Sequence, residues 1–396
     1  MNHITDPIVI VSAARTPIGG MLGDFTNTTA VELGAIAIRA AVERAGIDSH
    51  SIDEVIFGNC LMAGQGQAPA RQAALAAGLP HTAGAVTLSK MCGAGLKSVM
   101  LAHDMLVAGS ADVLISGGME SMTNAPHLML NSRKGYRYGA TTVYDHMAMD
   151  GLEDAYSRGT AMGVFAEKCN EKYGFTREAQ DTFAITSTQR AVTATHEGHF
   201  QWEIAPVILK SKTGDITIDK DEQPLKAKLE KIPSLRPAFK KDGTITAANA
   251  SSISDGAAAL VLMRASTAQA KGLKPLAKIV SHATHAQDPE WFTTAPLGAV
   301  NKVLAKAGWD KSQVDLWEIN EAFATVTMAL MHELNIPHQQ VNIHGGACAL
   351  GHPIGASGAR ILTTLIGALR QTSGKTGIAT LCIGGGEAVA LAIEMI

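Results

Sequence analysis

The chain contains two copies of one short pattern at a fixed separation, and this repeat constrains the fold more than any other feature of the sequence. Residues 45–53 (AGIDSHSID) match residues 307–315 (AGWDKSQVD), and 307 − 45 = 262. The same offset places residues 92–94 (CGA) on residues 354–356 (IGA). The repeat predicts two similar halves, each built from the same strand-helix unit.

Two further pairs of segments agree in kind with this repeat. IVS at residues 10–12 is matched by IVS at residues 279–281, and SGG at residues 116–118 is matched by GGG at residues 384–386. In such a pseudo-symmetric pair, the buried helices meet at the centre. Ligands are therefore expected near the N-termini of these helices and at strand ends.

Apolar spacing indicates alternating strands and helices in the first part of the chain. We expect buried strands at residues 8–14, 53–58, 86–88 and 111–116. Helices are expected at residues 30–45, within residues 64–79, where Pro69 opens an alanine-rich helix, and from Leu96 onward. Gly117 and Gly118 are expected to stop the last of these strands. This alternation predicts an α/β fold with a parallel sheet.

The alternation lapses from Met119 to about Ser234 and returns after Gly243. The intervening segment holds a polar, basic and aromatic piece at residues 133–138 (RKGYRY) and a helical stretch at residues 178–198. We interpret it as an inserted subdomain. The predicted domains are an N-terminal half at residues 1–118, completed by about residues 243–270, an inserted subdomain at residues 119–242, and a C-terminal half at residues 271–396.

Composition narrows the class of protein. The 396 residues are 46% hydrophobic and only 17% charged, which suffices for a large core. A net charge of −3 argues against nucleic acid and anionic membranes as partners. The five cysteines include no CxxC pair, which favours free thiols in a reducing compartment, the cytoplasm. We find no signal peptide and no transmembrane segment in the sequence.

Cys92 lies at an expected strand-to-helix turn. Gly93 and Gly95 let the backbone turn sharply and leave space beside the sulfur. Free N–H groups and the positive end of the helix dipole are expected to favour a thiolate there, which would make Cys92 a nucleophile. The alternative is a small buried cysteine at a tight helix entry.

The second copy holds two more candidates. Asn320 lies at the junction of a strand and a helix, where its amide either caps the helix or points into a cavity. His352 belongs to the irregular, glycine-rich residues 342–358, just before a helix that starts near Ala359. Its place resembles that of Cys92, so the two side chains are candidates for base and nucleophile; a structural role is the alternative.

The strand at residues 378–383 ends in three glycines, with Cys382 at its carboxyl end. A dinucleotide-binding loop needs such glycines before a helix, whereas residues 387–394 are expected to form a strand. We therefore reject the interpretation of these glycines as a dinucleotide-binding loop. His282, His285 and Asp288 are weak evidence for a metal site, and no metal is expected.

Several motifs together closely resemble those of the thiolases, the acetyl-CoA acyltransferases. They occur in the family's order and span nearly the whole chain; CIGGG separates this pattern from the Cys-His-His set of the related ketoacyl synthases. The motifs are ARTPIG at residues 14–19, CGAGLK at 92–97, GGMESM at 117–122, TAANAS at 246–251, NEAF at 320–323, GGACALGHPIGASG at 345–358 and CIGGG at 382–386. The resemblance implies a thiolase-like fold, two duplicated βαβαβ-type halves that form a five-layered αβαβα core with an inserted loop subdomain.

The resemblance also implies catalytic roles. Cys92 corresponds to the acylated nucleophile, His352 to the base that activates it, and Cys382 to the acid/base that exchanges a proton with C2 of the acetyl group. Asn320, through a water and with His352, corresponds to one oxyanion hole. The backbone N–H groups of Cys92 and Gly384 correspond to the other.

Coenzyme A contacts follow from the same resemblance. Matching positions that would line a tunnel for the pantetheine arm are Leu152, Met162, Leu235, Phe239, Ala247 and Ser251. The loop at residues 224–233 aligns poorly, so adenine contacts are not assigned. CoA thioesters are the expected substrates, with no metal or bound cofactor, and a homodimer or homotetramer is expected.

The implied reaction is a reversible Claisen condensation of two acetyl-CoA to acetoacetyl-CoA, as in acetyl-CoA C-acetyltransferases. Two alternatives stay open: a 3-ketoacyl-CoA thiolase of broader chain length (an acetyl-CoA C-acyltransferase) in fatty-acid β-oxidation, and an inactive acyl-CoA-binding module. Residues 161–163 (AMG) replace the His-Met-Gly of many acetoacetyl-specific members, which leaves the chain length open. The sequence does not assign the direction of flux or a role for Cys348.

Overall fold

Strands from both ends of the chain join in one sheet. The computed structural model describes residues 6–212 and 214–396. Within these residues, a single ten-stranded sheet runs in the order β12 (Leu316–Ile319), β13 (Thr376–Ile383), β14 (Glu387–Met395), β11 (Ala277–Ala286), β1 (Ile8–Arg15), β10 (Ser254–Arg264), β5 (Val113–Ser121), β3 (Glu54–Gly58) and β4 (Gly84–Leu88), with β2 (Gly19–Gly20) paired to β10. The two halves of this sheet meet at β1 and β11.

The sheet is mixed, so the prediction of a parallel sheet was wrong in part. β3 pairs with β4 and β5 in parallel, and β12 pairs with β13 in parallel. β10 returns antiparallel to β5 after the long insertion, and β14 returns antiparallel to β13 after a tight turn. Only the strands joined by crossover helices are parallel, as the length of their connections requires.

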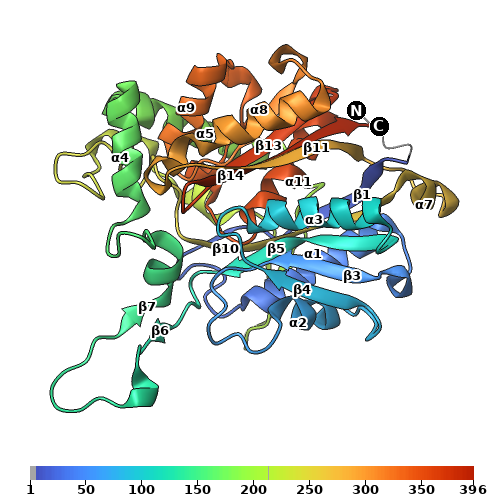
Figure 1. Ribbon diagram of the computed structural model, residues 1–396, viewed down its shortest axis with the longest axis horizontal. Helices are drawn as coiled ribbons and strands as arrows, with labels where there is room; N and C mark the ends of the chain where they lie inside the picture. The colour runs from blue at the N-terminus through green and yellow to red at the C-terminus, as the bar shows by residue number, and fades with distance from the viewer. Residues whose placement is uncertain (1–5, 213) are drawn as a thin grey trace.

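Helices cover the two halves of the sheet on both faces. α3 (Ala94–Ala108) and α11 (Ser357–Thr372) lie between the halves, and their apolar side chains share one core with both. α1 (Ala30–Ala45) and α2 (Pro69–Ala76) cover the outer face of the first half (Figure 1). α8 (Ala295–Ala307) and α9 (Ala324–Leu334) cover the outer face of the second. The result is the five-layered αβαβα arrangement.

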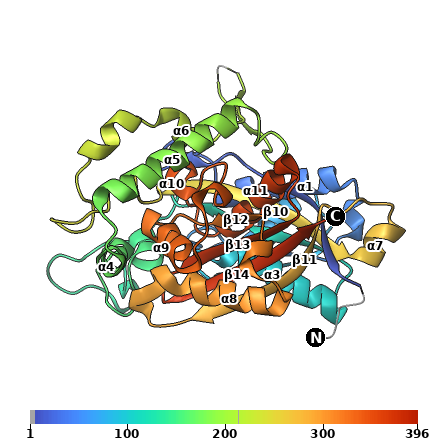
Figure 2. The same cartoon turned by 90° about the horizontal axis from the view of Figure 1, so that it is seen from above.

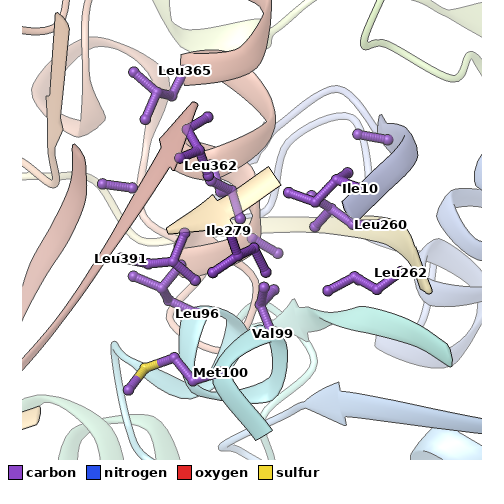
Figure 3. Close-up of a cluster of buried hydrophobic side chains, with 14 of the residues drawn as sticks. Ile10, Leu96, Val99, Met100, Leu260, Leu262, Ile279, Leu362, Leu365 and Leu391 are labelled. Atoms are coloured by element: carbon purple, nitrogen blue, oxygen red, sulfur yellow. The ribbon is translucent and has the colours of Figure 1, made fainter. Parts of the chain in front are cut away.

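The central layer is packed with aliphatic side chains from both halves (Figure 3). Leu96 and Val99 of α3 lie in one cluster with Leu362 and Leu365 of α11, and all four are fully buried. Burying each such side chain contributes roughly 1.5–3 kcal/mol. This cluster holds the N-terminal ends of the two central helices at fixed positions.

The internal repeat is visible in matching contacts. β1 and β11 carry a bulge at the same place, between residues 10 and 12 and between residues 279 and 281. Just after each bulge, a serine hydroxyl donates to a carbonyl of the covering helix: Ser12 to Ala41 (2.6 Å) and Ser281 to Val303 (2.9 Å). The duplicated sequence therefore builds a duplicated structure.

The two matched segments, residues 45–53 and 307–315, end the outer helices of the two halves in the same way. Gly46 ends α1 and Gly308 ends α8, both in the left-handed conformation (φ 66° and 69°). Further on, the carboxylates of Asp53 and Asp315 accept hydrogen bonds from backbone N–H groups at the start of β5 and of β13. These two aspartates are the last residues of the matched segments.

β5 continues through the two glycines that were expected to stop it and ends at Ser121. A Cβ atom at Gly117 would lie 2.0 Å from the carbonyl oxygen of Ala258, and one at Gly118 would lie 2.0 Å from that of Gly355. The glycines therefore permit close approach of other backbone segments and do not break the strand.

The predicted match of residues 116–118 with residues 384–386 was also wrong. The strand register of the two halves places Leu114 and Gly377 at equivalent positions, so Gly384 corresponds to Ser121. The triple glycine forms the turn between β13 and β14, and the long insertion takes the place of that turn in the first half.

β4, the strand that leads directly to Cys92, is less buried than expected. β4 forms one end of the sheet and pairs only with β3 among the described strands. Val86 is 45% exposed, because no strand covers the outer side of β4. The position of the strand was predicted correctly, but its full burial was not.

The residues between β5 and β10 form helices and short strand pairs. They comprise β6 (His127–Leu128), β7 (Tyr144–Asp145), α4 (Met162–Tyr173), α5 (Arg177–His196), β8 (Val207–Leu209), β9 (Ile216–Ile218) and α6 (Glu222–Lys226). α5, predicted at residues 178–198, lies beside α10 (Ala347–Leu350) (Figure 2). β6, β7 and the loop between them, which contains residues 133–138, extend away from the core (Figure 1).

The remaining elements connect these layers. α7 (Ala265–Ala270) follows β10, and α10 is one helical turn inside the glycine-rich segment that was expected to be irregular. No helix in residues 6–212 and 214–396 is both long and apolar enough to cross a membrane.

Candidate active site

A cavity of about 470 Å³ lies where the N-terminal ends of α3 and α11 meet the end of β13. Cys92, two residues before α3, and His352, five residues before α11, both line it. Cys382 and Gly384, at the end of β13 and in the turn after it, line it as well. The fold therefore brings four of the five predicted catalytic residues into one cavity.

Cys92 lies in the turn between β4 and α3, as predicted. Met91, directly before it, has a left-handed backbone (φ 47°), which is costly for a residue with a side chain. A Cβ atom at Gly93 would lie 2.4 Å from Ile383 of the other half. The turn is thus pressed against the C-terminal half, and this contact fixes the position of the sulfur.

The thiol of Cys92 does not have the lowered pKa that we expected from its place before a helix. Burial raises the pKa of Cys92 to about 11. The backbone N–H groups of Gly384 and of Cys92 itself hydrogen-bond the sulfur and act in the opposite direction, but burial outweighs them. Cys92 is therefore a neutral thiol near pH 7, and a base must take its proton before it can attack.

His352 is held as a defined tautomer. The hydroxyl of Ser357 donates to the carbonyl oxygen of Pro353 (2.9 Å), so its oxygen must accept from Nδ1 of His352, 2.6 Å away. This hydrogen-bond network assigns the ring proton to Nδ1. Nε2 then carries the lone pair and is the atom that can accept a proton.

The environment also keeps this imidazole neutral. Burial, with a smaller contribution from the positive charge of Arg360, lowers the pKa of His352 to about 3. Together with the raised pKa of Cys92, this makes a thiolate-imidazolium pair unfavourable in the resting protein. These two shifts favour a neutral pair, in which a proton would move from sulfur to nitrogen only as the sulfur attacks.

Asn320 follows β12 and is fully buried. It caps no helix, since α9 begins after Phe323 without a side-chain cap. Its amide nitrogen lies 3.5 Å from both ring nitrogens of His352, and its Oδ1 has no hydrogen-bond partner. Asn320 is not part of the cavity wall; it lies against the histidine.

Cys382 is fully buried on β13 and faces the same cavity. Burial raises the pKa of its thiol well above the usual value, and the nearby Cys92 adds to this. A thiol with a raised pKa becomes a strong base once it loses its proton. This is the property needed to remove a proton from carbon.

Two residues that support the site were missed in the sequence. Ser357, which sets the tautomer of His352, lies inside the GASG motif but was given no role. Glu120, inside the GGMES motif, is fully buried and accepts hydrogen bonds from the backbone N–H groups of Cys60, Leu61 and Gly355. Burial raises the pKa of Glu120 to about 7. Both motifs were recognised as a pattern, but only the fold shows what these side chains bind.

The cavity wall is mostly apolar and contains no lysine or arginine among the described residues. Of the six residues predicted to contact the pantetheine arm, five line it: Leu152, Met162, Phe239, Ala247 and Ser251. Leu235 is half-buried after a short 3₁₀ helix and is not part of the wall. Ala161, directly before α4, is part of it.

Cys348 lies in α10, outside this cavity. Its sulfur is 3.7 Å from the carbonyl oxygen of Glu321, and burial next to that residue raises its pKa well above the usual value. The Glu321 carboxylate accepts from the backbone N–H of Cys348 (3.0 Å) and from the Ser187 hydroxyl (2.7 Å). Cys348 is therefore a packed thiol in a buried hydrogen-bond network.

Known proteins and family models match this chain over nearly its whole length. Two family models match it: "Thiolase, N-terminal domain" at residues 8–266 and "Thiolase, C-terminal domain" at residues 273–395. Acetyl-CoA acetyltransferase 1 of Arabidopsis thaliana is 50% identical over 390 residues, which cover 98% of this chain and 94% of that protein.

Solved structures are similar as well. The Ascaris suum Acat5 thiolase in complex with coenzyme A has a TM-score of 0.93 and 41% identity, with 98% of this chain and all of that chain covered. The Bacillus anthracis acetyl-CoA acetyltransferase has a TM-score of 0.96 and 40% identity, with 99% of both chains covered.

Proposed function

The chain belongs to the thiolase family, and from this premise we propose that it is an acetyl-CoA acetyltransferase that condenses two acetyl-CoA to acetoacetyl-CoA and free CoA, or runs the reverse thiolysis. The observation that carries the proposal is one apolar cavity lined by Cys92, His352 and Cys382. A nucleophile, a base and a second acid/base are the groups that a two-step acyl transfer needs.

The first step is acyl transfer to Cys92. Nε2 of His352 takes the thiol proton as the sulfur attacks the carbonyl carbon of acetyl-CoA. The bond from this carbon to the sulfur of CoA breaks, and Cys382 gives its proton to the leaving thiolate. The products are an acetyl-enzyme, free CoA, a protonated His352 and a Cys382 thiolate.

The second step forms the carbon-carbon bond. The Cys382 thiolate takes a proton from C2 of a second acetyl-CoA, and the resulting carbanion attacks the acetyl group on Cys92. The bond to the Cys92 sulfur breaks, and His352 returns its proton to that sulfur. All three groups are then in their starting state, and acetoacetyl-CoA leaves.

Negative charge develops on an oxygen in both steps. The backbone N–H groups of Cys92 and Gly384 favour negative charge at the Cys92 sulfur, and we propose that they also hold the acyl oxygen. The enolate oxygen of the second acetyl-CoA would lie near Nε2 of His352, and Asn320, which lies against the histidine outside the cavity wall, would act on it through a water. Losing one such donor typically costs about 10²–10³ in rate.

The substrate class follows from the cavity wall. An apolar wall without lysine or arginine suits the mostly uncharged pantetheine arm of a CoA thioester. The similar Ascaris suum structure contains coenzyme A, which supports the same assignment. We propose that the reaction needs no metal or bound cofactor, since cysteine and histidine supply every proton transfer.

We also propose which segments of the chain supply the reactive side chains and which supply the rest of the cavity wall. The nucleophile, base and acid/base come from the two halves at residues 1–118 and 271–396. Much of the remaining wall comes from residues 148–163 and 238–253, in or next to the insertion at residues 119–242. All five cysteines are free thiols, which supports a reducing location such as the cytoplasm. A homodimer or homotetramer remains the expected assembly.

One observation favours a second candidate, a 3-ketoacyl-CoA thiolase of broader chain length. Ala161 contributes only a methyl group to the wall where many acetoacetyl-specific relatives have a histidine, so the cavity has more apolar room there. The two candidates share the mechanism and differ in the acyl group.

CoA-dependent cleavage of acetoacetyl-CoA, 3-ketohexanoyl-CoA, 3-ketooctanoyl-CoA and 3-ketohexadecanoyl-CoA separates the candidates. We expect activity confined to the four-carbon substrate, and no activity in Cys92→Ser. Activity that holds or rises with chain length would favour the broader enzyme. No cleavage of any substrate, with CoA binding intact, would contradict both and support an acyl-CoA-binding module.

A further inference from the structure

A second group of metal-ligating side chains lies outside the acyl-transfer cavity. Within residues 6–212 and 214–396, it is the one group of three or more histidine, cysteine or acidic side chains whose ligand atoms come close enough to bind one ion. It consists of His103 and Asp104 on α3 and His282 on β11. None of the three residues lines the cavity that holds Cys92.

The three ligand atoms form a tight triangle. Nδ1 of His103 and Oδ1 of Asp104 are 3.1 Å apart, Nε2 of His282 and Nδ1 of His103 are 3.1 Å apart, and Nε2 of His282 and Oδ1 of Asp104 are 2.9 Å apart. The two imidazole rings are nearly perpendicular, at 83°. Two nitrogens and one oxygen on a single face match the three-ligand sets of zinc.

Hydrogen bonds can bridge at most two edges of this triangle, because each of the two nitrogens carries at most one hydrogen. With the ring protons on the other nitrogens, the two imidazole lone pairs and a carboxylate lone pair converge on one face. This is the arrangement that binds a cation, which would lie on that face with each of the three atoms as a ligand.

The surroundings leave such an ion accessible. The side chains of His103 and His282 are only 10% and 13% exposed, whereas that of Asp104 is 54% exposed. The buried rings fix two ligand positions, and the carboxylate side opens to solvent for entry and for a fourth ligand. The neighbouring Lys306 is bonded through its Nζ to the carbonyl oxygen of His282 (2.9 Å).

This group is not the set noted in the sequence. Of His282, His285 and Asp288, only His282 belongs to it. Nε2 of His285 contacts Gln287, and the side chain of Asp288 accepts from the backbone N–H of Glu290. Spacing along one strand therefore paired the wrong residues, because the partner of His282 comes from α3.

We propose that His103, Asp104 and His282 bind a divalent transition-metal ion of the zinc type. The ion would link α3 of the first half to β11 of the second. α3 is also the helix that directly follows Cys92. This role is structural and independent of the proposed acyl transfer, and borderline nitrogen and oxygen ligands favour zinc over magnesium or calcium.

The test is a titration of the full-length, metal-free protein with Zn²⁺, followed by calorimetry, for the wild type, Asp104→Ala, His282→Gln and the control His50→Ala. His50 also contacts an aspartate, Asp48 (3.0 Å), but is exposed and lacks a second imidazole. Asp104 is exposed, so its replacement should leave the fold intact. We expect the wild type and the control to bind one equivalent of Zn²⁺. Both ligand variants should lose this binding, or bind Zn²⁺ with an affinity lower by about 100-fold or more.

Cobalt separates this site from the cysteines of the acyl-transfer cavity. Co²⁺ held by two histidines and a carboxylate lacks the sulfur-to-cobalt charge-transfer band that a thiolate site gives. We expect the wild type to bind one equivalent of Co²⁺ without that band, and Asp104→Ala to lose this equivalent. Thiolysis by Asp104→Ala should be unchanged in metal-free buffer. Equal Zn²⁺ stoichiometry in the wild type and both ligand variants, or only sulfur-type cobalt spectra, would overturn the proposal.

Discussion

The turns that begin the two central helices occupy equivalent places but are held in different ways. In the first half, the turn at Cys92 and Gly93 packs against Ile383 of the opposite sheet. In the second half, the turn at Gly355 packs against Glu120, which accepts a hydrogen bond from the Gly355 N–H (3.0 Å). By the strand register, Ile383 and Glu120 are equivalent residues.

This difference explains how one repeated frame supports asymmetric chemistry. The carboxylate of Glu120 holds the backbone at Gly355, three residues after His352, the proposed base. Ile383 is apolar and accepts no hydrogen bond from the turn at Cys92, and the N–H groups of Cys92 and Gly384 favour negative charge at the sulfur. Duplication places two helix N-termini together, and side-chain differences between the halves would divide the proposed roles of base and nucleophile.

The largest expected effect comes from the glycines that let the halves touch. In Gly118→Ala, the new Cβ would lie 2.0 Å from the carbonyl oxygen of Gly355, which backbone packing holds in place. We expect a loss of about 4 kcal/mol or more in the free energy of unfolding, measured by denaturant titration. Gly384→Ala is the matched control, since its Cβ would meet only Met162 at 3.6 Å and should change stability little. Equal stability of the two variants would contradict the close approach of the Gly118 backbone to Gly355.

The next effect separates the two steps of the reaction. Cys382→Ser should lower the rate of condensation by about 10²–10⁴, because a serine hydroxyl cannot replace the thiolate as a base toward carbon. Acetylation of Cys92 by acetyl-CoA should persist at a reduced rate. Quenched-flow measurement of the acetyl-enzyme and of acetoacetyl-CoA checks both. Condensation at the wild-type rate would remove Cys382 from the mechanism.

A smaller effect tests how the base is oriented. Ser357→Ala removes the acceptor for Nδ1–H of His352, and we expect kcat to fall about 10- to 100-fold with little change in KM. Ser98, a buried hydroxyl on the central helix of the other half, provides the control: Ser98→Ala should affect stability alone. Rescue of kcat by Ser357→Thr would support an orienting role, whereas an unchanged kcat in Ser357→Ala would exclude it.

The smallest effect concerns pH. The pKa of His352 in the folded protein, about 3, lies below its usual value, so the unfolded chain binds this proton first as the pH falls. Stability is therefore lost as the pH falls through the usual histidine pKa. His352→Gln should lose less stability than the wild type between pH 7 and pH 4, measured by denaturant titration at each pH, while the exposed His50→Gln should follow the wild type. Parallel curves for all three proteins would contradict the buried, neutral imidazole.

Local patterns in the sequence predicted much of the frame. The helix at residues 30–45 was predicted at its observed bounds, and the turn at Cys92 was placed between its strand and helix. Apolar spacing and glycines encode such features locally. The duplication was also readable, because the turn residues around Gly46 and Gly308 are matched in sequence.

Features that depend on distant contacts were not predictable in this way. The role of Gly118 depends on Gly355, far along the chain, and the raised pKa of Cys92 depends on burial that no local pattern reports. The same holds for His282, whose partners lie on α3. The motifs, through their resemblance to the thiolases, pointed to the candidate reactive residues, but the three-dimensional structure was needed to show their protonation and the groups that support them.

The proposed mechanism places the acyl group on Cys92 and on no other thiol. The direct test is to mix the protein with acetyl-CoA, quench with acid and locate the acetyl group by peptide mass spectrometry. We expect an acetyl group on the peptide containing Cys92, removed on addition of CoA and absent in Cys92→Ser. Acetylation of Cys382, Cys348 or Cys60 instead, or turnover without any acetylated peptide, would contradict it.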